Sequence, residues 1–369
     1  IAESLFAPDD ETQLKLLQSR YGGYWRYPKL KDFCYLVNPY FPNKKLIDEM
    51  QANFQTLLTQ YPSGMHINSL IAAKNFGLKE PQIIVGNGAA ELIKSLMEKL
   101  TGKIGVLHPS FEEYANRRKA EDLVPFVCQN PDYTYTADEL MEFYDKTDIK
   151  NLLIVNPDNP SGNYIPKADV IRLIAWAKQR SIKLVIDESF VDFVDMEENT
   201  TLLEQSLLNS NPHLYVVKSI SKSYGVPGLR LGILASGDAE AIATMKKDVA
   251  IWNINSFAEY FLQIFLIYKK DYVYGCSKIK EERNRFYNEL IKISELDVYD
   301  SEANYFMIKL NKSTANEIAE YLLDNNKILI KVLNGKNGFD DKEYIRIAVK
   351  TKEENDYFIQ SIKEYYDKK

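Results

Sequence analysis

The sequence has few of the residues that would place it in several common protein classes. Only three of its 369 residues are cysteines and only three are histidines. The cysteines, Cys34, Cys128 and Cys276, are odd in number and far apart. This excludes a disulfide framework and favours reduced thiols in the cytoplasm. The histidines lack the spacing of metal ligands, so we expect no metal site.

Long hydrophobic runs and an excess of positive charge are also missing. Apolar stretches are no longer than a strand, so we expect neither a transmembrane helix nor a signal peptide. The formal net charge is −6, which gives no general attraction for nucleic acid or an anionic membrane. An anionic ligand must therefore be held by a local cluster of cations. The first residue is Ile1 and not methionine, which leaves open whether the sequence is part of a longer protein.

Length and hydrophobic pattern predict two domains. Strand-like runs at residues 82–85, 103–107, 151–155, 183–186, 214–217 and 231–234 alternate with helical stretches such as 90–100 and 167–179. This alternation is typical of an α/β domain with a mostly parallel sheet. Beyond about residue 239, a helical region through 283–293 is followed by short strands and by helices at 314–325 and 352–366. We therefore expect an N-terminal segment (1–40), a large domain (41–240) and a smaller α+β domain (241–369).

One lysine lies in a pattern that suits covalent chemistry. Lys222 follows an apolar run, with Ser219 and Ser221 just before it and Arg230 further along. A lysine in low-dielectric surroundings can lose its proton and form a Schiff base with an aldehyde. Hydroxyls and the fork of an arginine suit a phosphate. The pattern predicts a site for pyridoxal phosphate; the alternative is a surface turn with two solvated cations.

Two turns that follow strand-like runs could contact the same cofactor. In the first, glycines precede Ala89 and Ala90, whose N–H groups at a helix start would bind an anion. Glu91 stands where a dinucleotide fingerprint has its third glycine, so a single phosphate fits better than a pyrophosphate. In the second, Asn159 lies in an Asn-Pro turn and its amide could face a ring hydroxyl. A plain surface turn is the alternative for both.

An acidic pair closes another apolar run. Asp187 and Glu188 are adjacent, and strand alternation places their side chains on opposite faces, so they are poor joint metal ligands. One carboxylate could hold a protonated pyridine nitrogen and make the ring an electron sink. We assign this role to Asp187; a solvated strand end is the alternative.

These segments, in this order, resemble those of the fold-type-I, pyridoxal-phosphate-dependent aminotransferase superfamily (class I/II). The likeness covers nearly the whole chain and is nearer to the histidinol-phosphate aminotransferase and threonine-phosphate decarboxylase branch. It implies a large α/β/α domain with a mostly parallel sheet and a smaller α+β domain. It also implies pyridoxal 5′-phosphate as the cofactor and a homodimer with shared active sites.

The resemblance implies a role for each matching cofactor residue. Lys222 would be the Schiff-base lysine and proton shuttle, Asp187 the partner of the pyridine nitrogen, and Asn159 the partner of the ring hydroxyl oxygen. Phe111 would stack on the ring, and Tyr61 would reach the phosphate bound by the neighbouring subunit. The residues implied to hold the phosphate are Ala89 and Ala90 by their backbone, Ser219, Ser221 and Arg230.

The substrate residues follow the family pattern less closely. Arg346 would hold the substrate carboxylate. Lys331 stands where the branch usually has an arginine for the substrate phosphate, and a lysine binds phosphate without the bidentate fork. Tyr21 and Gly23 belong to a segment that is similar to a His-Gly-Gly-Asn pattern of the threonine-phosphate decarboxylases. We expect these last three residues to approach the distal end of the substrate.

The sequence leaves the reaction itself open. Most members of the superfamily are transaminases, so we expect an aminotransferase that moves an amino group between a small amino acid, phosphorylated or otherwise anionic, and a 2-keto acid. The alternative is decarboxylation of a phosphorylated amino acid. It is favoured by residues 21–24 and by Phe190, which replaces a tyrosine of many aminotransferases. A non-catalytic protein is disfavoured because the lysine, aspartate and arginine set is complete.

Overall fold

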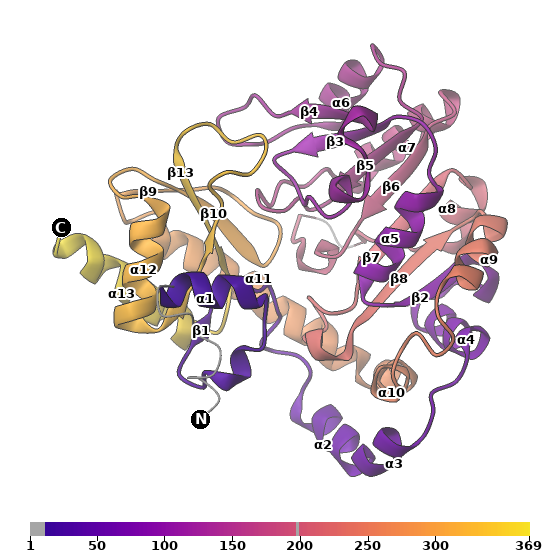
Figure 1. The fold of residues 1–369 in the computed structure, drawn as a ribbon, viewed down its shortest axis with the longest axis horizontal. Helices are drawn as coiled ribbons and strands as arrows, with labels where there is room; N and C mark the ends of the chain where they lie inside the picture. The colour runs from indigo at the N-terminus through magenta and orange to yellow at the C-terminus, as the bar shows by residue number, and fades with distance from the viewer. Residues whose placement is uncertain (1–11, 197–198) are drawn as a thin grey trace.

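The computed structural model describes residues 12–196 and 199–369, so residues 1–11 of the expected N-terminal segment lie outside it. At the centre of the described chain is a seven-stranded sheet with the order β2-β8-β7-β6-β5-β3-β4 (Figure 1). Its strands are β2 (Ile83–Asn87), β3 (Ile104–His108), β4 (Leu123–Val127), β5 (Asn151–Val155), β6 (Lys183–Asp187), β7 (Leu214–Ser219) and β8 (Leu231–Ser236). Strand β8 is antiparallel to both of its neighbours, and the other pairings are parallel.

Helices cover both faces of this sheet, because the strands carry apolar side chains on both sides. On one face, α5 (Ala89–Lys99) and α9 (Ala239–Asp248) pack on positions such as Ile84. Neighbouring positions, such as Ile83, belong to the core of the opposite face. The helices of that face are α4 (Met65–Phe76), α6 (Ala137–Tyr144), α7 (Lys167–Gln179), α8 (Gln205–Ser210) and α10 (Ser256–Ile264). The result is a three-layer α/β/α arrangement.

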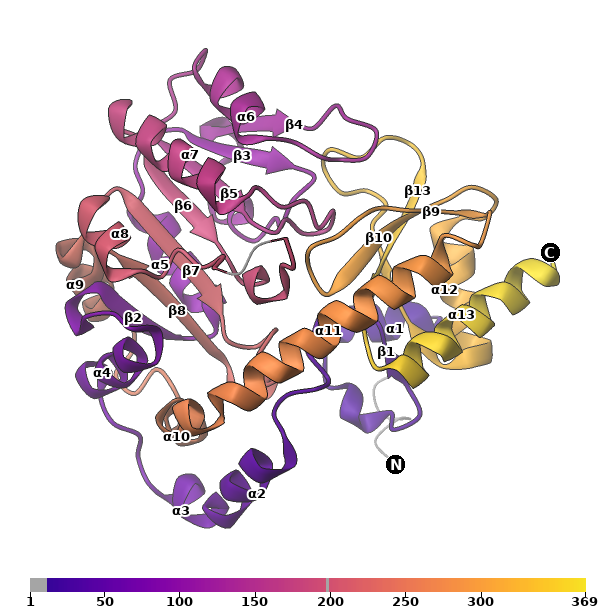
Figure 2. The ribbon, with the colours of Figure 1, turned by 180° about the vertical axis from the view of Figure 1, so that it is seen from behind.

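A second, smaller part contains a four-stranded antiparallel sheet with the order β12-β13-β10-β9. Helix α11 (Lys269–Leu290) extends from α10, beside the large sheet, to this smaller part, as Figure 2 shows. The other elements of the smaller part are β9 (Leu296–Val298), β10 (Tyr305–Leu310), α12 (Ala315–Asn326), β11 (Ile328–Leu329), β12 (Lys331–Val332), β13 (Glu343–Ala348) and α13 (Lys352–Asp367). The α/β class with a mostly parallel sheet and a smaller α+β part is thus confirmed.

The start of the described chain packs on the C-terminal part. Helix α1 (Gln13–Arg20) contacts α12, and β1 (Lys31–Asp32) pairs in parallel with β11. Conversely, α9 spans residue 240 and packs on the large sheet, and α10, which follows it, packs on α3 and α4 of the large part. The division at residue 240 therefore remains a prediction. In the described ranges, no helix has both the length and the apolar character needed to cross a membrane.

Local differences from the predicted elements have physical reasons. Strand β4 escaped prediction because Pro125 interrupts its apolar run, yet β4 is an edge strand, where a missing N–H is tolerated. The pattern of residues 45–58 predicts a single helix, but the structure has two there, α2 (Lys44–Ala52) and α3 (Phe54–Thr59). They are separated at Asn53, whose side chain donates to the Glu49 carbonyl and to the Tyr260 hydroxyl.

Candidate active site

A cavity of about 850 Å³ opens where the carboxyl ends of the parallel strands meet. Because β8 runs in the opposite direction, the residue before it, Arg230, reaches this same edge. Strand topology therefore brings segments far apart in sequence to one cavity. The predicted residues that line it are Tyr21, Gly23, Ala89, Ala90, Phe111, Asn159, Asp187, Ser219, Ser221, Lys222 and Arg230.

Lys222 has surroundings that favour its neutral amine. Burial of the amine is the main cause that lowers the pKa of Lys222, and the positive charges of Arg346 and Arg230 lower it further. The Asp187 carboxylate opposes them, and the pKa of Lys222 falls to about 8. A neutral amine, the form that attacks a carbonyl, is therefore populated near neutral pH.

Buried charges hold the turn that carries Lys222. The Lys218 ammonium lies 2.6 Å from Oδ2 of Asp192 and 3.8 Å from Oε1 of Glu188. Burial alone would lower the pKa of Lys218, but Asp192 and Glu188 raise it above the usual value. The Ser223 hydroxyl donates to the same Asp192 oxygen, at 3.3 Å. The residues on both sides of the turn are thus tied to one carboxylate.

Asp187 ends β6 with both carboxylate oxygens occupied. Oδ1 accepts hydrogen bonds from the N–H (2.9 Å) and the hydroxyl (2.6 Å) of Ser189, and Oδ2 accepts one from the Tyr114 hydroxyl (2.7 Å). Burial raises the pKa of Asp187, while these bonds and the charge of Lys222 lower it. The side chain is therefore fixed in orientation at the wall of the cavity. A carboxylate held in this way could face the nitrogen of a bound ring.

One end of the cavity has hydrogen-bond donors that other described residues leave unused. The Ser221 hydroxyl is buried and has no partner among the described residues, and no described side chain caps the start of α5 at Ala89. The Arg230 side chain donates only to the Pro227 carbonyl, at 3.5 Å. Gly88, at φ +76°, lies so close to Arg230 that a Cβ there would overlap the guanidinium. These donors fit a phosphate group.

Asn159 connects the two parts of the molecule. Its Oδ1 accepts a hydrogen bond from Nη1 of Arg346 on β13, at 2.7 Å. The other terminal nitrogen of Arg346 donates to the Cys34 carbonyl at 2.8 Å, and its Nε is buried with no partner from residues 12–196 or 199–369. Arg346 thus lies behind a residue of the cavity wall and keeps an unused donor.

Asp158 organises the loop next to Asn159. Its carboxylate accepts hydrogen bonds from the Ser110 hydroxyl, the Tyr135 hydroxyl and the Asn159 N–H. Burial raises the pKa of Asp158 to about 7, although these bonds lower it. Since Ser110 precedes Phe111, this carboxylate ties together two loops that contact the cavity.

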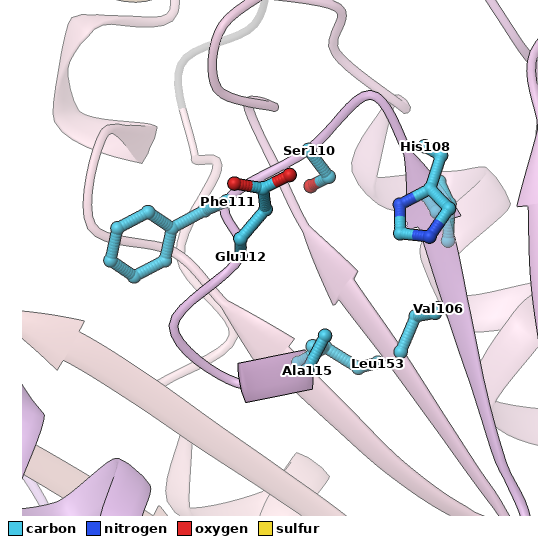
Figure 3. A pocket seen from close by; sticks show the side chains of 8 residues that line it. Val106, His108, Ser110, Phe111, Glu112, Ala115 and Leu153 are labelled. Atoms are coloured by element: carbon cyan, nitrogen blue, oxygen red, sulfur yellow. The ribbon is translucent and has the colours of Figure 1, made fainter. Parts of the chain in front are cut away.

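Phe111 lies in the loop that follows β3. Figure 3 shows its ring directed away from His108, on the other side of the loop. A small cavity of about 10 Å³ lies beside the same loop, with Ser110 in its wall. The Phe111 ring packs edge-on against Tyr114, at 6.2 Å between centroids, and Tyr114 binds Asp187. The proposed stacking residue and the proposed partner of the ring nitrogen are therefore connected through Tyr114.

Three predicted residues, Arg346, Tyr61 and Lys331, lie outside the cavity wall of the described chain. Tyr61 is 79% exposed, and its ring centroid is 4.6 Å from that of Trp252. Lys331 lies opposite Arg346 in the β12–β13 pair. Their roles toward a neighbouring subunit and a substrate remain predictions.

The structure also adds residues that sequence reasoning missed: Tyr114, Ser189, Asp158 and Lys218. All four act through hydrogen bonds or ion pairs to the site. Lys218 lies inside the lysine motif and Asp158 inside the Asn-Pro turn. The sequence could therefore have identified them only by their nearness to the other residues of those motifs. For metals, the described residues contain no group of three or more His, Cys, Asp or Glu side chains placed to bind an ion.

Comparison with known proteins gives a consistent result. The profile of the family described as aminotransferase class I and II matches residues 43–362. The L-serine phosphate decarboxylase of Sulfurospirillum multivorans is 31% identical over 344 residues, which are 90% of this chain and 87% of that protein. The histidinol-phosphate aminotransferase of Clostridium novyi is 32% identical over 301 residues, 79% of each chain.

A longer relative and a solved structure extend the comparison. The CMP-5'-(3-aminopropyl)phosphonate synthase of Streptomyces rubellomurinus is 30% identical over 364 residues, 98% of this chain. This chain spans only 57% of that protein's length. The structure of a decarboxylase from Sulfurospirillum multivorans superposes with a TM-score of 0.83 at 30% identity and covers 92% of this chain and 90% of that one.

Proposed function

We propose that this chain, which belongs to the aminotransferase class I and II family, removes CO₂ from an amino acid with a distal phosphate or phosphonate group. The cofactor is pyridoxal 5′-phosphate, as in the family. One observation carries the choice of reaction: the likeness to an L-serine phosphate decarboxylase extends over 90% of this chain, and a decarboxylase structure superposes over 92% of it.

The side chain at position 190 supports this choice. Phe190 lines the cavity, and its ring packs edge-on against Tyr305 at 5.0 Å. It has no hydroxyl to donate to a ring oxygen, unlike the tyrosine that the resemblance implies for many aminotransferases. The preference for amino transfer that the sequence suggested is therefore reversed. The aminotransferase reading keeps support from the family description and from the histidinol-phosphate aminotransferase relative.

We assign the residues of the cavity as follows. When bound, pyridoxal phosphate withdraws electrons from the bond that breaks at the substrate Cα. Lys222, with a pKa of about 8, holds the cofactor at rest and then moves a proton at Cα through its Nζ. Asp187 keeps the ring nitrogen protonated, and Asn159 donates to the ring oxygen. Arg346 binds the substrate carboxylate.

The phosphate of the cofactor is proposed to occupy the unused donors at the start of α5. The backbone N–H groups of Ala89 and Ala90 and the side chains of Ser219, Ser221 and Arg230 surround this position. A helix N-terminus and a guanidinium both favour an anion there. The rest of the cavity is left for the substrate.

We also propose that two copies of the chain share their active sites. Tyr61 is exposed and does not line the cavity of its own described chain, so its proposed phosphate contact requires a partner. Apolar side chains that precede Tyr61 or its ring partner Trp252 in the sequence are exposed as well, among them Phe54, Leu58 and Ile251. We place the protein in the cytoplasm, which its three free cysteines support.

Parallel product analysis tests the reaction. Purified protein with pyridoxal phosphate is incubated with O-phospho-L-serine or O-phospho-L-threonine, with and without a 2-keto acid, and CO₂ and keto-acid products are both measured. We expect CO₂ release that does not depend on the added keto acid. Amino transfer without CO₂ release would restore the aminotransferase reading. L-Serine is the matched control without the distal anion.

A further inference from the structure

Arginines without an acidic partner are concentrated at the cavity. The sequence has ten arginines, and six of them form ion pairs with Asp or Glu in the described chain: Arg117, Arg118, Arg172, Arg180, Arg283 and Arg285. The other four have no carboxylate partner among the described residues: Arg20, Arg26, Arg230 and Arg346. Arg230 lines the cavity, and Arg346 binds Asn159 in its wall. Arg20 and Arg26 adjoin Gly23, another wall residue.

The proposed function accounts for only two of these four charges. Arg230 is assigned to the cofactor phosphate and Arg346 to the substrate carboxylate. Arg20 and Arg26 are then left for a third anion. The proposed substrate carries one such anion, its distal phosphate or phosphonate, and this step rests on the proposed function.

The geometry around Gly23 brings the two guanidinium groups together. Arg20 is the last residue of α1, and Arg26 ends the short helical turn Tyr24–Arg26. A Cβ built on Gly23 would lie 2.9 Å from Nη1 of Arg26 and 3.9 Å from Nη2 of Arg20. The same point is 3.8 Å from the Trp25 ring, which lines the cavity. Both guanidinium groups therefore converge beside the cavity wall.

Aromatic rings position these arginines and leave their donors unused. The Arg20 guanidinium lies 5.6 Å from the centroid of the Tyr27 ring, and that of Arg26 lies 5.0 Å from the Trp25 ring. The Nε of Arg20 is buried and has no partner in the described ranges of the chain. Neither side chain forms a hydrogen bond or an ion pair with another described residue.

The backbone adds further donors at the same place. The N–H groups of Gly22 and Gly23 have no acceptor in the part of the chain that the structure describes. Both glycines line the cavity. Gly23 has φ +72°, and a side chain there would press on Arg26, so the site requires a glycine.

We propose that Arg20 and Arg26, with the N–H groups of Gly22 and Gly23, bind the distal phosphate or phosphonate group of the substrate. Two like charges close together repel each other, and a tetrahedral anion between them removes that repulsion. The forked guanidinium matches the oxygens of such an anion better than a lysine does. These two arginines, rather than Lys331, determine the preference for an anionic substrate.

Binding measurements on the cofactor-loaded protein test this proposal without relying on turnover. Calorimetric titration gives the dissociation constants of phosphoethanolamine and of ethanolamine for the wild type, Arg20→Gln, Arg26→Gln and the double variant. We expect each single variant to weaken phosphoethanolamine binding about 10- to 100-fold, the range for a charge-assisted hydrogen bond, and the double variant to weaken it further. Ethanolamine binding should not change.

Two control variants complete the experiment. Arg172→Gln removes an exposed arginine that pairs with Asp138 and Asp169 and should bind both ligands like the wild type. Lys331→Ala tests the competing cation. The proposal is overturned if the wild type does not bind phosphoethanolamine, if the arginine variants bind it unchanged, or if only Lys331→Ala loses it. Tight, arginine-dependent binding without CO₂ release from O-phospho-L-serine would instead reject the proposed function and keep this site.

Discussion

Arg346 donates a 2.7 Å hydrogen bond to the side-chain oxygen of Asn159 and so links β13 to the loop that follows β5. With its oxygen engaged, the Asn159 amide has its NH₂ group left for the cavity. An NH₂ group can only donate, which suits a ring oxygen that carries negative charge. The arginine proposed for the substrate therefore also orients a residue proposed for the cofactor.

The first prediction concerns the attachment point of the cofactor. Purified protein should be yellow, and Lys222→Ala should lose the colour while its fold is kept. Borohydride reduction followed by peptide mass spectrometry should place the cofactor on Lys222. Labelling of a different lysine, such as the neighbouring Lys218, would contradict the assignment.

Attachment should also depend on pH. The attacking species is the neutral amine, and the pKa of Lys222 is about 8, so the attachment rate in cofactor-free protein should rise with pH and level off above about 8. Below that pH it should fall about tenfold per unit, following the neutral fraction. Arg346→Gln removes a positive charge that lowers this pKa and should move the midpoint upward. A midpoint that stays in place would exclude Arg346 as a cause.

Asp187→Asn should abolish most of the activity and leave the fold intact. The ring nitrogen would lose the anion that keeps it protonated, and loss of one such preorganised electrostatic contact lowers kcat on the order of 100-fold or more. Turnover and thermal unfolding of the variant are measured side by side. Near-normal turnover would mean that Asp187 is a strand end and that another group holds the nitrogen.

Lys218→Met should destabilise the protein strongly. It leaves Asp192 and Glu188 without their cation, and removing one partner of a buried ion pair costs about 3–5 kcal/mol. Urea unfolding of Lys218→Met, with and without Asp192→Asn, measures this, and the double variant should recover part of the loss. Lys44→Met breaks an exposed pair with Asp48 and should cost less than about 1 kcal/mol. Equal effects of the two lysine variants would show that Lys218 is not a structural anchor.

Shared active sites predict recovery of activity in mixed dimers. Tyr61→Ala and Lys222→Ala chains should each have low activity, but a hybrid of the two has one site with both side chains intact. Unfolding and refolding the two variants together should therefore give more activity than either variant refolded alone. Activity that remains low in the mixture, or a monomer with full activity, would argue against sharing.

Sequence reasoning succeeded where chemistry follows directly from a strand end. Asp187 ends a parallel strand, and Lys222 and Asn159 lie just beyond two others, so the topology places all three at one edge. It failed where a residue acts through a distant partner. Tyr114 and Asp187 are 73 positions apart in the sequence, so no local sequence pattern predicts the hydrogen bond between them.

The substrate end was harder to foresee for the same reason. Arg20 and Arg26 look like ordinary surface cations in the sequence, because the absence of an acidic partner is visible only in three dimensions. Helix α1 was missed as well. Its mean polarity hides the two buried positions, Leu14 and Leu17, that attach it to the rest of the protein.

The single reversed strand also sets an order of events during synthesis. Strand β2 has β8 as its one neighbour in the large sheet of the described chain, and their paired residues are separated by well over 100 positions, for example Ile83 and Ala235. Until a ribosome has released β8, β2 has no strand beside it, and Arg230 is absent from the donors at the start of α5. Such distant pairing slows folding and exposes an open strand edge. A chain that stops before residue 230 therefore lacks one donor of the proposed phosphate site and leaves β2 without its neighbouring strand.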